Sequence, residues 1–432
     1  MATVTFQELM SSGHLEIGDG YRAKHSELGG TGLIFLRAGH LADTGFDFDN
    51  VERFREDLAA SLQGKIAEAG DTVVTTKGNS TGRVGYVEAD FPRFVYSPHL
   101  SYWRSKKPNV VAPEFLRYWS RGCEFRDQLE AMKTSTDMAP YLSLTDQRRL
   151  RITLPKPHVQ VGIGTALSAL DERIKQNISV NRSLEALASA LFQSWFVDFD
   201  PVAAKRDGRR PIGAPAGASA LFPRHFEESE LGPIPQGWRI VPFDSVADFL
   251  NGLALQRYPA RAHDELPVIK IAQLRAGTSV GADRCGGVPP EYVIDDGDVV
   301  FSWSGSLMID VWCGGKGALN QHLFKVTSNE VPKWFYLAWL NEHLPEFQRI
   351  AADKATTMGH IRRFHLTEAK VLVPPEPLME AITSVQQPLL DQIIHNRLES
   401  RTLAELRDTL LGPLLSGELT IKSAENTVGA AL

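Results

Sequence analysis

IGTALSALDERIKQNISVNRSLEALASALFQSW, residues Ile163–Trp195, decides the fold, because its apolar side chains recur at steps of four and three. That spacing is typical of the a/d seam of a coiled-coil helix. The same spacing returns near the end of the chain, in the run from Leu378 to Leu410. The sequence therefore predicts two long helices, each with one apolar seam.

Both seams contain amides near their middle, namely Asn177, Asn181, Gln392 and Asn396. A buried amide in an apolar seam lowers stability and is usually a device that fixes register and orientation. If the helices run antiparallel with residue numbers that sum to 573, Asn177 faces Asn396 and Asn181 faces Gln392. We expect these four residues to set the register of an antiparallel pair. The alternative is that each amphipathic helix packs separately on its own domain.

The two helices belong to a longer internal repeat, whose offset is constant in the helical part and larger upstream. The matched segments are Leu144-Thr145 with Leu366-Thr367 at an offset of 222, Gly70–Val74 with Gly297–Phe301 at 227, and Leu36 with Ile269 at 233. Two copies of more than 200 residues are each the size of a domain. The repeat indicates two equivalent modules with a pseudo-twofold relationship.

Upstream of each helix, short β-type runs alternate with glycine and proline turns, and amphipathic helical stretches lie between them. We expect strands at 33–36, 72–76, 83–87, 268–271, 299–302 and 323–326, and helices at 51–68, 113–132 and 332–352. The fold class is therefore α+β, with two globular domains separated by two long antiparallel coiled-coil helices. The expected boundaries are 1–154 for the first domain, 155–200 for its helix, 201–236 for an exposed linker, 237–375 for the second domain, 376–417 for its helix and 418–432 for a frayed tail.

The composition is that of a soluble globular chain, with 432 residues, 43% hydrophobic and 23% charged. No apolar run is long enough to cross a membrane, and the start lacks a secretory signal, so we expect a cytoplasmic protein. Cys123, Cys285 and Cys313 lie far apart, which indicates neither a disulfide framework nor a zinc site. A net charge of -6 argues against indiscriminate nucleic-acid binding.

Several fragments resemble catalytic motifs but have the wrong spacing. Gly78–Gly85 is glycine-rich without the G-x-G-x-x-G pattern, and Gly314–Gly317 lacks the first glycine and the Ser or Thr of a P-loop. Ser304-Gly305-Ser306 differs from the G-x-S-x-G elbow of a hydrolase. We therefore expect no catalytic residue, metal or cofactor in this chain. This favours a recognition protein, with its chemistry supplied by partners.

Each domain carries one loop rich in amides, hydroxyls and cations, the groups that contact base edges and phosphates of DNA. In the first domain the candidates are Lys77, Asn79, Ser80, Arg83, Arg104, Lys106 and Lys107; in the second they are Ser304, Ser306, Lys316, Asn320, Gln321 and His322. Polar loops of this kind are usually plain solvated turns. Their duplication next to two long helices favours a binding role.

The chain also resembles a known family over nearly its full length, the DNA-specificity subunits of type I restriction-modification systems. The stretches that carry the resemblance are SWFVDFDP at 194–201, ELGPIPQGW at 230–238, SWSGS at 302–306, WCGG at 312–315, ALNQHL at 318–323 and LGPLLSG at 411–417. The first domain departs from the pattern: it lacks a copy of 230–238, and Ser97-Pro98-His99-Leu100 stands where the second domain has Asn320–Leu323.

The resemblance implies two target-recognition domains, each reading one half of a split site in double-stranded DNA. It also implies two modification subunits, which supply an adenine methyltransferase, and two restriction subunits, which supply translocation and cleavage. The chain itself would be no enzyme. The competing hypothesis is a coiled-coil scaffold that bridges two protein partners without reading DNA.

Overall fold

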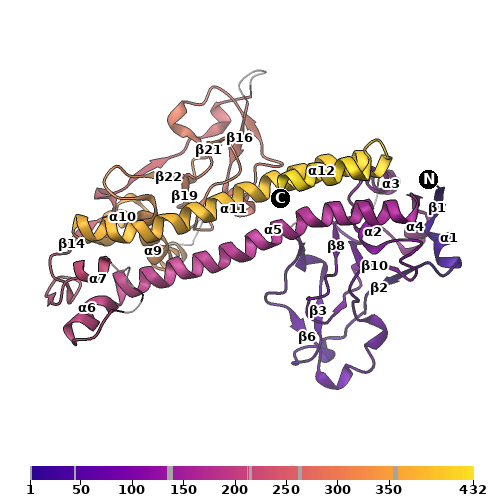
Figure 1. Cartoon of the computed structure of the whole chain (residues 1–432), viewed down its shortest axis with the longest axis horizontal. Coiled ribbons are helices and arrows are strands. Elements are labelled where there is room, and N and C mark those ends of the chain that lie inside the picture. Colours follow the sequence, from indigo (N-terminus) through magenta and orange to yellow (C-terminus); the bar gives the residue numbers. More distant parts are fainter. Residues whose placement is uncertain are drawn as a thin grey trace. The chain divides into compact units, whose positions relative to one another are not determined.

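The computed structural model describes residues 2–42, 45–133, 140–211, 213, 217–260, 265–353 and 359–432. The chain forms two compact units. We call residues 1–173 with 403–432 the first unit, and residues 174–402 the second unit. Both units contain helices and strands, so the expected α+β class is confirmed (Figure 1). Each of the two long helices is divided between the units, whereas the sequence placed both outside the globular domains.

The first unit is built on a four-stranded antiparallel sheet. Its strand order is β2 (Leu15–Asp19), β10 (Leu100–Ser105), β7 (Thr72–Thr75) and β8 (Val84–Tyr86). A second sheet joins β6 (Glu52–Arg53), β3 (Ile34–Leu36) and β9 (Phe94–Tyr96), and β3 runs parallel to β9. The remaining elements are α1 (Phe6–Ser11), β4 (Leu41–Ala42), β5 (Gly45–Phe46), α2 (Pro113–Trp119), α3 (Cys123–Lys133) and α12 (Ile421–Ala431).

The second unit repeats this sheet with the same order and the same antiparallel pairing. Its strands are β15 (Asp248–Asn251), β22 (Leu323–Thr327), β19 (Val299–Ser302) and β20 (Met308–Val311). A parallel pair is again present, between β16 (Leu266–Ile269) and β21 (Gly317–Leu319). The other elements are β12 (Phe226–Glu227), β13 (Ile234–Pro235), α8 (Ile271–Ala276), β17 (Arg284–Cys285), β18 (Val293–Ile294) and α9 (Lys333–Asp353). The internal repeat is therefore a repeat of topology.

A short helix and a two-stranded ribbon precede each long helix. The first set is α4 (Leu144–Arg149), β1 (Ala2–Thr5) paired with β11 (Arg151–Leu154), and α5 (Pro157–Phe192); the second is α10 (Arg363–Glu368), β14 (Arg239–Pro242) paired with β23 (Lys370–Val373), and α11 (Glu376–Ser416). The long helices start at residues 157 and 376, and the short ones at 144 and 363, so both offsets are 219. The offset of 222 from the Leu-Thr match is wrong. Leu144 is the first residue of α4, whereas Leu366 is the fourth residue of α10, so the two Leu-Thr dipeptides do not occupy equivalent positions.

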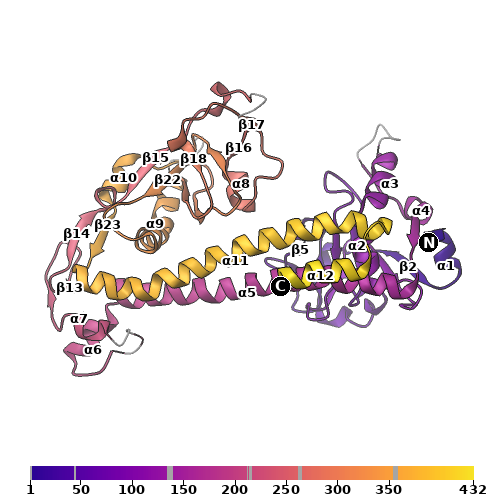
Figure 2. The ribbon, with the colours of Figure 1, turned by 45° about the horizontal axis from the view of Figure 1, so that its top comes forward.

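Within the second unit, α5 and α11 pack antiparallel (Figure 2). The side-chain nitrogen of Gln386 donates to the carbonyl oxygen of Ala188 at 3.1 Å, and that of Asn181 donates to the carbonyl oxygen of Ile393 at 3.1 Å. Within the first unit, Arg407 of α11 reaches Asp171 of α5 at 2.7 Å. The coiled-coil arrangement is thus confirmed in each unit by itself.

Three expectations about local structure are wrong. Residues 51–68 form strand β6 and two 3-10 turns, with Phe54 buried from a β-bridge to Leu28 and Leu62 buried from a turn. The presumed linker contains α6 (Asp200–Arg206) and α7 (Ala218–Leu221), where the ammonium of Lys205 donates to the carbonyl oxygens of Ser219 and Ala220. The presumed frayed tail forms α12, with Ala424 and Val428 buried.

Candidate nucleic-acid interface

The site of the second unit lies where strand β19 ends. Ser304 follows this strand, and its hydroxyl lies 2.8 Å from Nδ1 of His322, which sits in the turn before β22. The indole nitrogen of Trp303 donates to the side-chain oxygen of Asn251, the last residue of β15, at 2.8 Å. The strand ends therefore bring residues 251, 303–304 and 320–322 together at one edge of the sheet.

A glycine makes this convergence possible. The backbone nitrogen of Gly252 donates to the carbonyl oxygen of Leu323 at 3.0 Å, and a Cβ at Gly252 would overlap the carbonyl oxygens of Leu319 and Asn320. Only a residue without a side chain lets the two backbones approach so closely. Gly252 therefore positions the turn that holds His322.

The first unit builds the same arrangement from different side chains. The backbone nitrogen of Gly20 donates to the carbonyl oxygen of Leu100 at 3.1 Å, and a Cβ at Gly20 would overlap the carbonyl oxygen of Ser97. The turn before β10 contains His99, whose carbonyl oxygen accepts from the backbone nitrogen of Thr76 at 2.9 Å. The sequence match between Ser97–Leu100 and Asn320–Leu323 thus joins equivalent turns.

A fourth segment completes the edge in both units. In the first, Lys77 forms an antiparallel bridge with Tyr141, and the backbone nitrogen of Gly78 donates to the carbonyl oxygen of Pro140 at 3.2 Å. In the second, Ser304 forms the same bridge with His360, and Gly305 donates to the carbonyl oxygen of Gly359 at 2.8 Å. Both loops are therefore anchored on two sides, which pre-organises whatever they present. We call these two edges the strand-end sites.

The structure places part of the first set of candidates in the strand-end site. Lys77 and Asn79 are exposed, whereas Ser80 is half-buried and its carbonyl oxygen accepts hydrogen bonds from the Thr75 hydroxyl and from the backbone nitrogen of Arg83. The Arg83 guanidinium donates to the carbonyl oxygen of Leu41 at 2.9 Å. Lys77 and Asn79 are the residues of this loop that face solvent.

Arg104 belongs to a different part of the first unit, and its candidate role is corrected. Its side chain is only 11% exposed, and its guanidinium lies 2.7 Å from Asp71 and 2.5 Å from Glu68. Burial alone disfavours the charged guanidinium, but the hydrogen bond and charge of Asp71 outweigh it and raise the pKa of Arg104. Arg104 is an internal ion-pair partner, with its guanidinium also 4.7 Å from the centre of the Tyr102 ring.

Lys106 and Lys107 are exposed but lie at the wrong end of the sheet. Leu100 of β10 pairs with Thr75 beside the strand-end site, whereas the strand ends at Ser105. Five steps of about 3.3 Å put these ends roughly 17 Å apart. The ammonium of Lys106 lies 3.4 Å from Glu16. The sequence-based prediction grouped Lys106 and Lys107 with Lys77 because they lie near it in the sequence, but the structure places them at the opposite end of β10.

In the second unit, five of the six candidates lie in the strand-end site and one does not. Ser304 and Asn320 are buried, Gln321 and His322 are half-buried, and the amide nitrogen of Gln321 lies 3.3 Å from Nε2 of His322. Ser306 is exposed in the same loop. Lys316 is exposed but precedes β21, and Asn320 follows that strand, so the strand separates the two.

Several residues of the strand-end sites were not among the candidates that the sequence suggested. They are Gly20, Thr76 and Tyr141 in the first unit, and Asn251, Gly252, Trp303 and His360 in the second. A glycine directly after a β-type run was the one usable sign, since such a glycine often marks a close backbone approach. The partner of that approach is visible only in three dimensions.

The seam amides form a network between α5 and α11 within the second unit. Nδ2 of Asn396 donates to Oδ1 of Asn181 at 2.8 Å, and Nε2 of Gln392 donates to Oδ1 of Asn396 at 2.7 Å. Nδ2 of Asn177 donates to Glu399 at 2.8 Å and to the carbonyl oxygen of Asn396 at 3.3 Å. Asn396 thus bonds Asn181 through its side chain and Asn177 through its backbone, where the sequence paired Asn181 with Gln392.

The described part of the chain holds no group of three or more His, Cys, Asp or Glu side chains that could bind a metal ion. Its helices include none long and apolar enough to span a membrane.

Comparison with known proteins supports one class. No family model matches the chain. Among curated proteins, the chain is similar to the type I restriction enzyme HindI specificity subunit of Haemophilus influenzae, with 20% identity over 439 residues that cover 90% of this chain and 94% of the relative. It is also similar to the MjaIX specificity subunit of Methanocaldococcus jannaschii, with 24% identity covering 72% of this chain and 70% of that one.

Among solved structures, the type I restriction-modification S subunit from M. genitalium has the same fold, with a TM-score of 0.55 and 14% identity over 96% of this chain and 95% of that one. The duplicated topology of this chain therefore falls in the fold class of a type I S subunit. The chain is thus similar to the specificity subunits of type I restriction-modification systems, the family that its sequence motifs resemble.

Proposed function

We propose that the chain is a sequence-specific DNA-binding subunit that recognises a bipartite target. Each strand-end site reads one half of the target in double-stranded DNA. The observation that carries this proposal is the duplication of the same backbone frame, with Gly20 and Gly252 at equivalent places and different side chains around them. A conserved frame with varied side chains suits two readers of different half-sites.

The side chains of the two sites differ in kind, which supports different half-site sequences. The first site presents Lys77 and Asn79, a phosphate-type cation and an amide that can bond adenine in the major groove. The second presents Ser306, Gln321 and His322 beside the Trp303 ring. Amides and imidazoles contact base edges, whereas lysines mainly hold phosphates.

The chain works with partners in this proposal. Two modification subunits supply the adenine methyltransferase and two restriction subunits supply translocation and cleavage, so the chain directs chemistry without performing it. A net charge of -6 fits this arrangement, because an acidic chain has little sequence-independent affinity for DNA. Two linked readers gain affinity through effective concentration, so each can bind weakly alone.

The test is selection from random duplex DNA with the modification subunit present. We expect enrichment of two short motifs separated by a fixed gap. Enrichment of no motif, or of a single contiguous one, would favour the competing function of a scaffold that bridges two proteins. Alanine substitution of Lys77 and Asn79 should then change one half of the motif only.

A further inference from the structure

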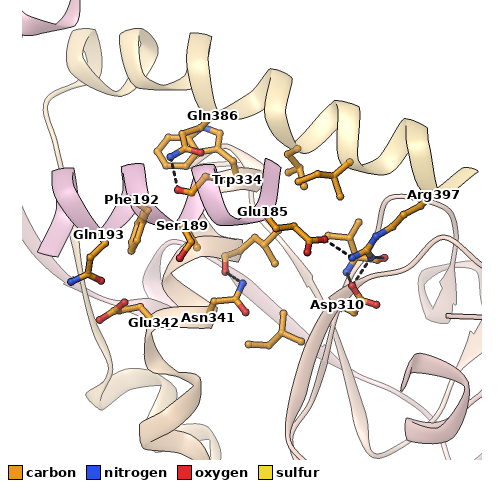
Figure 3. A pocket seen from close by; sticks show the side chains of 17 residues that line it. Glu185, Ser189, Phe192, Gln193, Asp310, Trp334, Asn341, Glu342, Gln386 and Arg397 are labelled. Atoms are coloured by element: carbon orange, nitrogen blue, oxygen red, sulfur yellow. Dashed lines mark hydrogen bonds and ion pairs between the residues drawn. The ribbon is translucent and has the colours of Figure 1, made fainter. Parts of the chain in front are cut away.

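The second unit contains a cavity of about 470 Å³ between α5, α11, α9 and β20 (Figure 3). Its apolar wall includes Phe192 and Trp334, and polar groups such as Glu185, Asn341 and Glu342 line the rest. The volume is large enough for a bulky side chain or a small ligand. The strand-end sites contribute no lining residue, so the cavity is a separate feature of this unit.

The first unit fills the equivalent place with a buried ion cluster. Counted from the helix starts at 157 and 376, Ala188 of α5 corresponds to Arg407 of α11, since each lies 31 positions in. By the same count Leu390 of α11 corresponds to Asp171 of α5, each 14 positions in. Ala188 and Leu390 both line the cavity of the second unit. The cavity therefore exists where an arginine and an aspartate have been replaced by an alanine and a leucine.

The cluster in the first unit shows what such a place accommodates. Nη1 of Arg407 lies 2.7 Å from Oδ1 of Asp171, and Oδ2 of Asp171 accepts from Arg117 and from the Tyr118 hydroxyl at 2.7 Å each. The Asp171 side chain is only 7% exposed. An arginine stem packed between helices, with its guanidinium held by carboxylates, fills this part of the frame.

The cavity of the second unit keeps acidic groups although the first unit's aspartate is absent. Glu185 and Asp310 hold Arg397, at 3.0 Å and 2.6 Å from its guanidinium. Glu342 of α9 is exposed at the rim and makes no ion pair with any residue that the structure describes. Three carboxylates and one guanidinium thus line the cavity, and the Glu342 carboxylate is open to a cation from outside.

We propose that this cavity binds an arginine side chain of a partner protein segment. The aliphatic stem packs against the wall formed by Phe192, Trp334 and Leu390, where Ala188 leaves room. The guanidinium reaches the Glu342 carboxylate at the rim, next to Ser189 and Gln193. The arginine of the partner thus supplies to the second unit the guanidinium group that Arg407 supplies to the first unit. The two units of the frame are therefore unequal in what they can bind.

The experiment titrates the full-length chain, without DNA, with N-acetyl-arginine-amide and follows binding by calorimetry. We expect saturable binding of one equivalent. N-acetyl-citrulline-amide, the uncharged analogue, should bind at least about tenfold more weakly, because a charge-assisted hydrogen bond is lost. Equal binding of both compounds, or no binding of the arginine compound, would overturn the proposal. Tighter binding of free arginine than of the capped form would also overturn it, because the ligand would then be the free amino acid.

Variants locate the bound probe. Ala188→Arg places in the cavity the side chain that the first unit has, and should abolish binding, whereas Ala190→Arg on the exposed face of the same helix should leave it unchanged. Glu342→Gln changes one exposed atom and keeps the fold, so it tests the carboxylate even if Ala188→Arg misfolds. Unchanged affinity in Glu342→Gln would refute the assigned contact. Failure of these tests leaves the DNA-reading proposal untouched, because no DNA is present.

Discussion

Nδ2 of Asn396 donates a hydrogen bond to Oδ1 of Asn181 at 2.8 Å in the seam between α11 and α5, and both side chains are buried. Because a buried polar atom without a partner is costly, removing either side chain alone leaves Oδ1 of Asn181 or Nδ2 of Asn396 without this hydrogen bond. Asn396→Leu should lower the free energy of unfolding by about 1–3 kcal/mol. The double variant Asn181→Leu/Asn396→Leu should recover part of that loss. Urea unfolding of the wild type, the two single variants and the double variant measures these free energies.

The same pair makes a prediction about register. Two leucines pack well in a seam but specify its alignment poorly, since the amides select one pairing of the helices. If the chain reads the bipartite target proposed above, we expect the double variant to do so with a less uniform gap than the wild type. A fixed gap combined with lower stability would show that the amides contribute stability and leave register to other contacts.

A second prediction concerns the buried carboxylate of the first unit. Burial alone raises the pKa of Asp171, but Arg117, Arg121 and Arg407 outweigh it, so this pKa lies below its ordinary value of 3.8. Asp171→Asn leaves three guanidinium groups without their common anion and should cost about 3–5 kcal/mol. Urea unfolding of the wild type and of Asp171→Asn at neutral pH measures this loss.

The pH dependence of stability follows from the same shift. A carboxyl whose pKa is depressed in the folded state stabilises the protein above the unfolded pKa and loses this contribution as pH falls through the folded one. The contribution of Asp171 is therefore complete above about pH 5 and declines below pH 3.8. The difference in stability between wild type and Asp171→Asn should narrow in that acidic range. A constant difference down to pH 3 would contradict the assignment.

A third prediction tests the close approach at Gly20. Gly20→Ala places a methyl group on the carbonyl oxygen of Ser97, so the turn with His99 must shift. We expect weaker binding to one half of the DNA target and a stability loss of roughly 1–3 kcal/mol. Gly39→Ala is the matched control in the same unit, because a Cβ there meets no atom within 4 Å. Equal effects of both substitutions would remove the role given to Gly20.

A fourth prediction separates two exposed lysines of the first unit. Lys77 lies in the strand-end site, and Lys107 follows the far end of β10. Lys77→Ala should weaken DNA binding several-fold and reduce the slope of affinity against salt by about one ion. Lys107→Ala should leave both quantities unchanged in the same titrations. The opposite ranking would move the interface to the other end of the sheet.

Much of the frame was predictable because it follows from periodicity. The a/d spacing of 163–195 and 378–410 predicted both long helices, and short apolar runs located two strands of each four-stranded sheet, β7 and β8 in the first and β19 and β22 in the second. Residues 51–68 failed because apolar residues in successive turns can imitate a helical period. The offset of 222 failed because a Leu-Thr dipeptide is too common to fix a register.

The site was predictable only in part, because the sequence gives the charge of a side chain but not whether that side chain faces solvent or an internal partner. Arg104 and Lys77 look alike in a sequence, yet one is held by Asp71 and the other faces solvent. The backbone approach at Gly252 depends on a turn about 70 residues further along the chain, at Asn320. Loops that carry function are positioned by such distant contacts, and no local pattern records them.

The first unit is assembled from both ends of the chain, since residues 403–432 complete a body that begins at residue 1. Arg407 and Ile421, which lie beside Asp171 and Gly162, are therefore synthesised after every residue of the second unit. The second unit is continuous in sequence, and all its residues precede residue 403. The first unit can thus be completed only after the whole second unit has been made, and a chain truncated after residue 402 would have a complete second unit and a first unit without residues 403–432.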